Sequence, residues 1–201
     1  MANWIQLMGL GARAIMLILL LLSVWSVAVM IDRRAVFKRE IGISRMDELK
    51  RLLASGNPQL LKAWAESNPS YIGGVVLAAL NAGSKSPEAV DRAVQSYLTE
   101  QKLKLEKGLN FLATLASNAA FIGLLGTVMG IIQSFGILSS QQGSAMNAVM
   151  FGLAEALVTT AIGIFVAVPA AVAFNHFGNR LRNANLEAGA VRDLYISKVA
   201  G

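Results

Sequence analysis

The chain has 201 residues, of which 55% are hydrophobic and 15% charged, with 18 Lys and Arg against 12 Asp and Glu. Soluble domains are about 45–50% apolar and about 25% charged, so an ordinary soluble enzyme is disfavoured, and a disordered chain would be far less hydrophobic. The absence of Cys excludes a disulfide scaffold, a thiolate zinc site and a cysteine nucleophile.

Charged residues are distributed unevenly along the chain. Arg13 is the only charged residue among residues 1–31, and Glu155 is the only one among residues 108–179. Residues 32–107 hold 13 basic and 9 acidic side chains. This pattern indicates a membrane protein with one polar block between its apolar segments, and Glu155 is the exception within it.

Residues 1–31 are predicted to contain a periplasmic N-terminus and the first transmembrane helix. Residues 14–31 are 18 uncharged residues, close to the roughly 20 that cross a bilayer core of about 30 Å. A cleaved signal peptide is the alternative, since Ser26 and Ala28 resemble a small-x-small cleavage site, but its positive charges would precede the apolar run. Here they follow it, which by the positive-inside rule places the next segment in the cytoplasm. These basic residues are Arg33, Arg34, Lys38 and Arg39.

Residues 32–110 are predicted to form a cytoplasmic helical domain. Ser44 and Asp47 resemble the capping box of a first short helix, which the Gly56-Asn57-Pro58 turn ends. Pro58 suits the first turn of a second helix. Residues 71–82 form a third, apolar helix that ends at a glycine.

Ser86 is expected to cap a much longer helix. No stop signal other than Gly108 occurs between it and about Gly136. A helix of that length would measure about 75 Å and would run from the cytoplasm into the membrane. Its apolar part, residues 111–135, is the second predicted transmembrane helix.

Residues 136–148 are predicted as a short periplasmic loop, because they are uncharged and include a run of Ser, Gln and Gly. Residues 149–174 form the third predicted transmembrane helix, and the arginines that follow it begin a cytoplasmic C-terminal helix over 175–201. The predicted fold class is an all-α integral membrane protein with three transmembrane helices, in which long helices two and three extend into a helical cytoplasmic domain.

Glu155 lies about seven residues into the third predicted transmembrane helix. An ionised carboxylate there costs at least about 2.5–3.5 kcal/mol, so such residues persist where they face a bundle interior or a wet cavity. A protonated Glu with one interhelical hydrogen bond is the structural explanation, and an ion pathway is the functional one. Pro169 removes one helix hydrogen bond and predicts a kink near the inner end of this helix.

Small and polar side chains form a stripe on each of the last two transmembrane helices. At 100° per residue, Glu155 lies at one edge of its stripe. Such stripes allow close helix packing, which explains glycines but not a carboxylate, and threonine hydroxyls can also bind their own helix backbone. We predict that the stripes line a pore or pack around it, with Thr127, Gly123, Gly126 and Gly130 on the second helix and Thr159, Thr160, Gly152, Ala156 and Gly163 on the third.

The position of the predicted loop also gives the expected relative depth of the polar residues in the membrane. Thr127 is 14 residues before Gln141, the expected loop centre, and Glu155 is 14 residues after it. The two residues should therefore lie at about the same height in an antiparallel pair. Thr160 should lie about 7.5 Å closer to the cytoplasm. A carboxylate with hydroxyls at and below its level can support a short hydrated path.

The sequence lacks the motifs that would indicate an enzyme, a cofactor site or a metal site. The sequence has no P-loop, dinucleotide-binding glycine motif, metal-ligand spacing or nucleophile triad, so we predict no enzymatic activity, no cofactor and no metal site. His176, the only histidine, is expected to be an interfacial residue. Topology and attraction to an anionic lipid bilayer account for the basic residues, so no nucleic-acid partner is expected.

A single copy cannot both enclose a pore and shield its polar stripe from lipid. We therefore expect a homo-oligomer with the stripes turned inward. A central partner helix would then offer a second titratable group.

Two segments carry a family resemblance: FIGLLGTVMGIIQSF (121–135) and GLAEALVTTAIGIFVAVPA (152–170). They resemble the two signature helices of the MotA/TolQ/ExbB proton-channel family, and most closely its ExbB/TolQ branch. Within that resemblance, the GLLGT motif assigns the family's first threonine to Thr127. The EAL-x-x-T motif assigns its carboxylate to Glu155 and its second threonine to Thr160, whereas Thr159 is added only by the helical wheel.

The resemblance implies a bacterial inner-membrane protein with its N-terminus in the periplasm and its C-terminus in the cytoplasm. It implies a homopentamer around single-pass ExbD/TolR-like partners, each with a transmembrane aspartate, and a TonB/TolA-like protein that spans the periplasm. The function hypothesis is a proton-conducting stator subunit of an energy-transducing motor that drives transport, envelope maintenance or gliding. The alternative is a non-conducting scaffold that assembles partner transmembrane helices.

Overall fold

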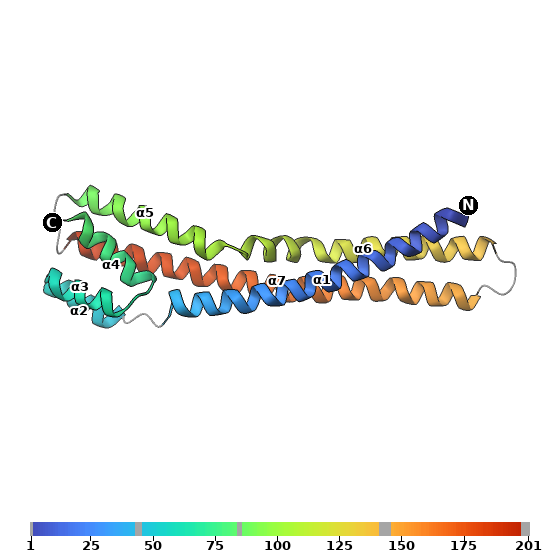
Figure 1. Ribbon diagram of the computed structural model, residues 1–201, viewed down its shortest axis with the longest axis horizontal. Helices are drawn as coiled ribbons and strands as arrows, with labels where there is room; N and C mark the ends of the chain where they lie inside the picture. Colours follow the sequence, from blue (N-terminus) through green and yellow to red (C-terminus); the bar gives the residue numbers. More distant parts are fainter. Residues whose placement is uncertain (1, 43–45, 84–85, 141–145, 198–201) are drawn as a thin grey trace. The chain divides into compact units, whose positions relative to one another are not determined.

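The computed structural model describes residues 2–42, 46–83, 86–140 and 146–197, which are helical apart from short connections (Figure 1). Its helices are α1 (Ala2–Glu40), α2 (Met46–Ser55), α3 (Pro58–Ser67), α4 (Tyr71–Ala82), α5 (Pro87–Glu106), α6 (Leu109–Ser140) and α7 (Met146–Tyr195). The segments long and apolar enough to cross a membrane are Gln6–Glu40, Leu109–Ser139 and Met146–Tyr195. The prediction of an all-α fold with three such helices is confirmed.

The described chain divides into two compact units. Unit 1 takes the residues up to Met30 and those of Gly108–Asn175, and unit 2 takes Ile31–Lys107 and the residues from His176 onward. Helices α1 and α7 therefore contribute to both units, whereas α6 belongs to unit 1 and α2 to α5 belong to unit 2.

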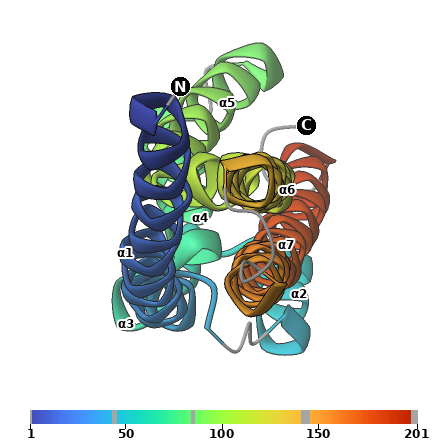
Figure 2. The ribbon, with the colours of Figure 1, turned by 90° about the vertical axis from the view of Figure 1, so that its right-hand side faces the viewer.

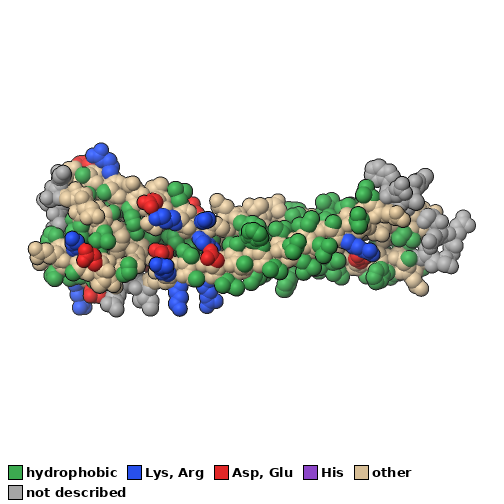
Figure 3. All heavy atoms as spheres, viewed as in Figure 1, with side chains coloured by type: hydrophobic (Ala, Val, Ile, Leu, Met, Phe, Trp, Pro, Cys, Tyr) green, Lys and Arg blue, Asp and Glu red, His purple; other side chains and the backbone are tan. Residues whose placement is uncertain are grey.

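Unit 1 is a bundle of α1, α6 and α7, and Figure 2 shows α6 and α7 nearly end on. Trp25 of α1 packs against Phe111 of α6 with ring centroids 6.2 Å apart. Large apolar side chains point away from the bundle, and Leu21, Phe121 and Phe165 are each at least 70% exposed. Hydrophobic side chains are spread along this unit's face in Figure 3. An outer surface with many exposed apolar side chains indicates contact with lipid or with other membrane helices.

Unit 2 packs α2 to α5 with the ends of α1 and α7. Phe37 of α1 contacts Phe177 of α7 with ring centroids 5.0 Å apart. The Tyr71 hydroxyl of α4 donates a hydrogen bond of 2.7 Å to Oδ1 of Asn185 on α7. The aliphatic core between the short helices consists of Leu49, Leu53, Leu61, Val75, Val76, Val90 and Val94, all at most 1% exposed.

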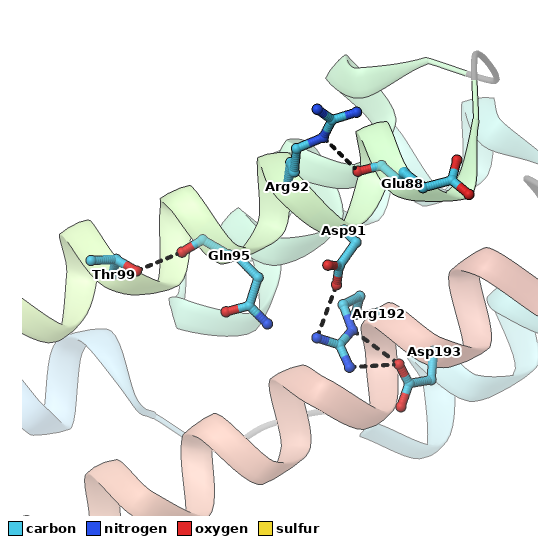
Figure 4. Close-up of polar contacts among 7 residues, drawn as sticks. All are labelled: Glu88, Asp91, Arg92, Gln95, Thr99, Arg192 and Asp193. Atoms are coloured by element: carbon cyan, nitrogen blue, oxygen red, sulfur yellow. Dashed lines mark hydrogen bonds and ion pairs between the residues drawn. The ribbon is translucent and has the colours of Figure 1, made fainter.

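An ion-pair cluster connects α5 to α7 within unit 2 (Figure 4). Nη1 of Arg192 lies 3.0 Å from Oδ1 of Asp91, and its Nη2 lies 2.9 Å from Oδ1 of Asp193. The Arg192 side chain is 23% exposed, so the guanidinium lies partly within the helix contact. Asp193 is the next residue of α7, so the Arg192–Asp91 pair is the contact of this cluster that joins α7 to α5.

The starts of the short helices follow the predicted signals. The side chain of Asn57 accepts from the backbone N–H groups of Gln59 and Leu60 at the start of α3. Ser70 caps α4, and Ser86 caps α5 as predicted. The capping box predicted at Ser44 lies outside the described residues, whereas α2 itself begins at Met46.

The continuous helix expected from Pro87 to about Gly136 is interrupted at Gly108. Helix α5 ends at Glu106 and α6 begins at Leu109. Gly108 has a φ of 81°, a left-handed conformation that an α-helix interior cannot contain and that glycine adopts without steric cost. The glycine named as the only stop signal therefore ends the helix.

Helices α6 and α7 are longer than the segments predicted to span the membrane. The predicted loop over 136–148 shrinks, because α6 continues to Ser140 and α7 begins at Met146; residues 141–145 lie outside the described residues. Helix α7 continues through Pro169 to Tyr195, which joins the third transmembrane segment and the tail helix into one element. A kink at Pro169 stays a prediction.

Candidate functional site

Thr127 of α6 and Thr160 of α7 bring two hydroxyl groups together inside unit 1. Their Oγ1 atoms are in hydrogen-bond contact. Oγ1 of Thr127 also lies 3.2 Å from the carbonyl oxygen of Ala156, and Oγ1 of Thr160 lies 3.2 Å from that of Gly123. Thr127 is only 8% exposed. A hydroxyl both donates and accepts, so this pair is a small polar centre between two apolar helices.

The predicted small residues lie at the contact between α6 and α7. A Cβ atom added at Gly163 would lie 2.7 Å from the Ala119 carbonyl oxygen and 2.9 Å from Cα of Gly123. A Cβ at Gly130 would lie 2.7 Å from Cβ of Ala156. Gly126 and Gly152 face the side chains of Thr159 and Ser134 in the same contact. Packing within one chain therefore accounts for these small residues, and pore lining by them stays a prediction.

Thr159 is placed differently from the other two threonines. It is 1% exposed, and its Oγ1 donates to the backbone oxygen of Glu155 at 3.0 Å, four residues earlier in α7. This is the local hydrogen bond that threonine can make within its own helix. The structure does not bring the Thr159 hydroxyl to the Thr127–Thr160 pair through any described hydrogen bond.

Glu155 is paired with Arg13, a partner that the sequence analysis did not identify. Nε of Arg13 on α1 donates to Oε1 of Glu155 on α7 over 3.1 Å. The Glu155 side chain is 26% exposed and that of Arg13 is 64% exposed in the single chain. The signal was present in the sequence, because these are the two isolated charges, of opposite sign, in stretches that are otherwise uncharged.

The heights of the polar residues differ from the estimate based on Gln141. The Thr127 hydroxyl contacts Thr160 rather than lying level with Glu155. The midpoint between the end of α6 at Ser140 and the start of α7 at Met146 is residue 143, so Thr127 is opposite residue 159. Moving the centre from residue 141 to residue 143 shifts the residue opposite Thr127 by four positions, which is about one helical turn.

Within the described ranges, no group of three or more His, Asp and Glu could hold a metal ion. His176 is exposed, and its ring lies 5.4 Å from that of Phe177 in an edge-on arrangement. Unit 1 thus contains a hydroxyl pair between α6 and α7 and an ion pair between α1 and α7. Such groups can accept, donate and hold a proton or hydrate a small cation.

A sequence profile of the MotA/TolQ/ExbB proton channel family matches residues 67–188, more than half of the chain. The chain belongs to this family. It is accordingly a multi-pass membrane protein of the ExbB/TolQ type, from a family of channel proteins rather than enzymes. The matched range contains the hydroxyl pair and Glu155, but not Arg13.

Individual relatives support the same family membership. The chain is 45% identical over 93 residues to the Tol-Pal system protein TolQ of Pseudomonas aeruginosa, covering 46% of this chain and 40% of that protein. It is 44% identical over 90 residues to the biopolymer transport protein ExbB of Xanthomonas campestris pv. campestris, covering 45% and 36%. A TolQ of Haemophilus influenzae is 39% identical over 108 residues, covering 52% and 47%. The matches span less than half the length of these MotA/TolQ/ExbB relatives.

Proposed function

We propose that this chain is the proton-conducting stator subunit of an energy-transducing motor in a bacterial inner membrane. The observation that carries the proposal is the Thr127–Thr160 hydroxyl pair, which lies between two membrane-length helices of a proton channel family member. Glu155 lies on α7 between the start of that helix and Thr160. Hydroxyls and a carboxylate at this spacing can pass or stabilise a proton with bridging water.

The proposed assembly follows the family. Because one chain has an apolar outer surface and a polar centre of only a few groups, several copies would surround the path, and we propose five. An ExbD/TolR-like single-pass protein would bring a transmembrane aspartate, and a TonB/TolA-like protein would carry the output across the periplasm. The relatives are a Tol-Pal system protein and a biopolymer transport protein, so envelope maintenance and transport are the outputs proposed here.

The proposal is tested by proton uptake into liposomes that contain the chain and its partner. Under an imposed pH gradient, Glu155→Gln and Thr160→Val should each lower the uptake rate at least about tenfold, because each removes a group that holds or relays a proton. Thr114→Val is the matched control, since Thr114 is exposed on α6 and bonds only its own helix at the Asn110 oxygen. Unchanged uptake in both test variants would contradict the proposal.

The scaffold alternative is favoured by one observation, the packing of the small residues of α6 and α7 within a single chain. It predicts that Glu155→Gln and Thr160→Val have little effect beyond assembly, so that variants which assemble with their partner support the same output as the unchanged chain. Assembly can be measured by co-purification, independently of proton uptake. Normal assembly with lost uptake separates conduction from scaffolding.

A further inference from the structure

The isolated charges of unit 1 meet although 142 residues separate them in the chain. Arg13 of α1 and Glu155 of α7 form an ion pair at 3.1 Å. Helix α6 contains no charged residue, and neither do the parts of α1 and α7 in unit 1 apart from this pair. Among the described side chains of unit 1, each charge therefore has the other as its single ionic partner.

The pair has a clear energetic reason in a membrane. A charged side chain in an apolar span costs several kcal/mol, and it persists where it meets an opposite charge or water. Removing one member of such a pair leaves the other uncompensated, which is much less favourable than keeping or removing both.

The geometry also directs the carboxylate. Nε of Arg13 binds Oε1 of Glu155 from the side of α1, whereas the Thr127 and Thr160 hydroxyls bind each other and backbone oxygens between α6 and α7. No described hydrogen bond joins Glu155 to either hydroxyl. Within one chain, Glu155 is thus bound to Arg13 and not to the hydroxyl pair.

We infer that Arg13 is a positioning residue of the proposed ion pathway: its guanidinium holds the Glu155 side chain on the α1 side of the bundle. The inference rests on the proposed function for its role in conduction. The ion pair itself is a separate claim, and it is testable without any measurement of proton transport.

The test is labelling of Glu155 by dicyclohexylcarbodiimide, which adds to carboxyl groups in apolar surroundings. The full chain in liposomes is labelled at about pH 7.5, and the modified peptide is quantified by mass spectrometry. The unchanged chain should label weakly, because the Arg13 guanidinium occupies the Glu155 carboxyl group, and Arg13→Gln should label at least about fivefold more. Arg13→Lys keeps a positive charge and should restore weak labelling.

Arg34→Gln is the matched control, because it removes one arginine charge from an exposed position of α1 in unit 2. It should label like the unchanged chain. Equal labelling of Arg13→Gln and the unchanged chain would overturn the inference, even if Glu155→Gln still abolishes proton uptake. Strong labelling of the unchanged chain at about pH 7.5 would also overturn it, and that result needs no variant to fold.

Discussion

Tyr71 is buried and Tyr97 is half-buried in unit 2, with ring centroids 6.3 Å apart. Burial raises the pKa of Tyr71 to about 12, and burial together with the nearby Glu40 raises the pKa of Tyr97 to about 12. In both cases the neutral phenol is the form that the folded unit accommodates. For Tyr71 this form also donates the hydrogen bond to Asn185.

Stability should therefore fall as the pH rises through this range. Between about pH 10 and 12 the unfolded chain loses phenolic protons that the folded chain keeps, so the free energy of unfolding decreases with pH. The loss should be on the order of 1–3 kcal/mol. Thermal unfolding of the detergent-solubilised protein at several pH values measures it, and Tyr71→Phe should weaken the dependence. A melting temperature that stays constant from pH 10 to 12 would contradict the prediction.

The contact between α6 and α7 is the element that places the hydroxyl pair. Gly163 faces the Ala119 carbonyl and Cα of Gly123, which are backbone atoms that cannot rotate away from an added methyl group. Close approach of the two helices at this level is what allows Thr127 and Thr160 to touch. Both threonines are thus positioned by glycines on the opposite helix.

Gly163→Ala should separate the helices and destabilise unit 1 by about 1–3 kcal/mol, because the added Cβ has no space. Gly178→Ala is the matched control: Gly178 lies in the same helix, and a Cβ there would meet nothing within 4 Å. Melting temperatures in detergent compare the two variants. Equal melting temperatures would show that the close contact does not support the bundle.

At the level of elements, much of the fold could be predicted from the sequence. Ser86 and the glycine at 108 mark helix ends through local chemistry that needs no tertiary information. The Arg13–Glu155 pair could not be predicted in the same way, because residues 14–31 are apolar on every side and leave the rotation of α1 undefined. The Thr127–Thr160 contact required the position of the turn, which a stretch of Ser, Gln and Gly does not define to within two residues.

For the molecule as a whole, family membership gives the class of protein, whereas its orientation in the membrane is a prediction from the charge pattern. Apolar helices long enough to span a membrane and a polar block after the first of them fit a periplasmic N-terminus with unit 2 in the cytoplasm. Ser139 near the end of α6 would then face the periplasm. Ser55 at the end of α2 would face the cytoplasm.

Single-cysteine labelling tests this orientation without background, since the chain has no Cys. Ser139→Cys should react with a membrane-impermeant maleimide in spheroplasts of the producing bacterium, because that reagent reaches only the outer face. Ser55→Cys should react only after the membrane is permeabilised. Both side chains are exposed in the folded chain, so burial does not protect them. The reverse pattern would invert the proposed topology.

The Arg13–Glu155 pair affects which charges of the protein respond to the membrane voltage. Two opposite charges that move as one body transfer no net charge through the transmembrane field, whereas a lone charge gains or loses about 2.3 kcal/mol per 100 mV. The membrane voltage would therefore act on the transported ion and exert no net force on the Arg13–Glu155 pair. If the pair were separated, the membrane voltage would act on each of its charges individually, and the protein would then carry a gating charge.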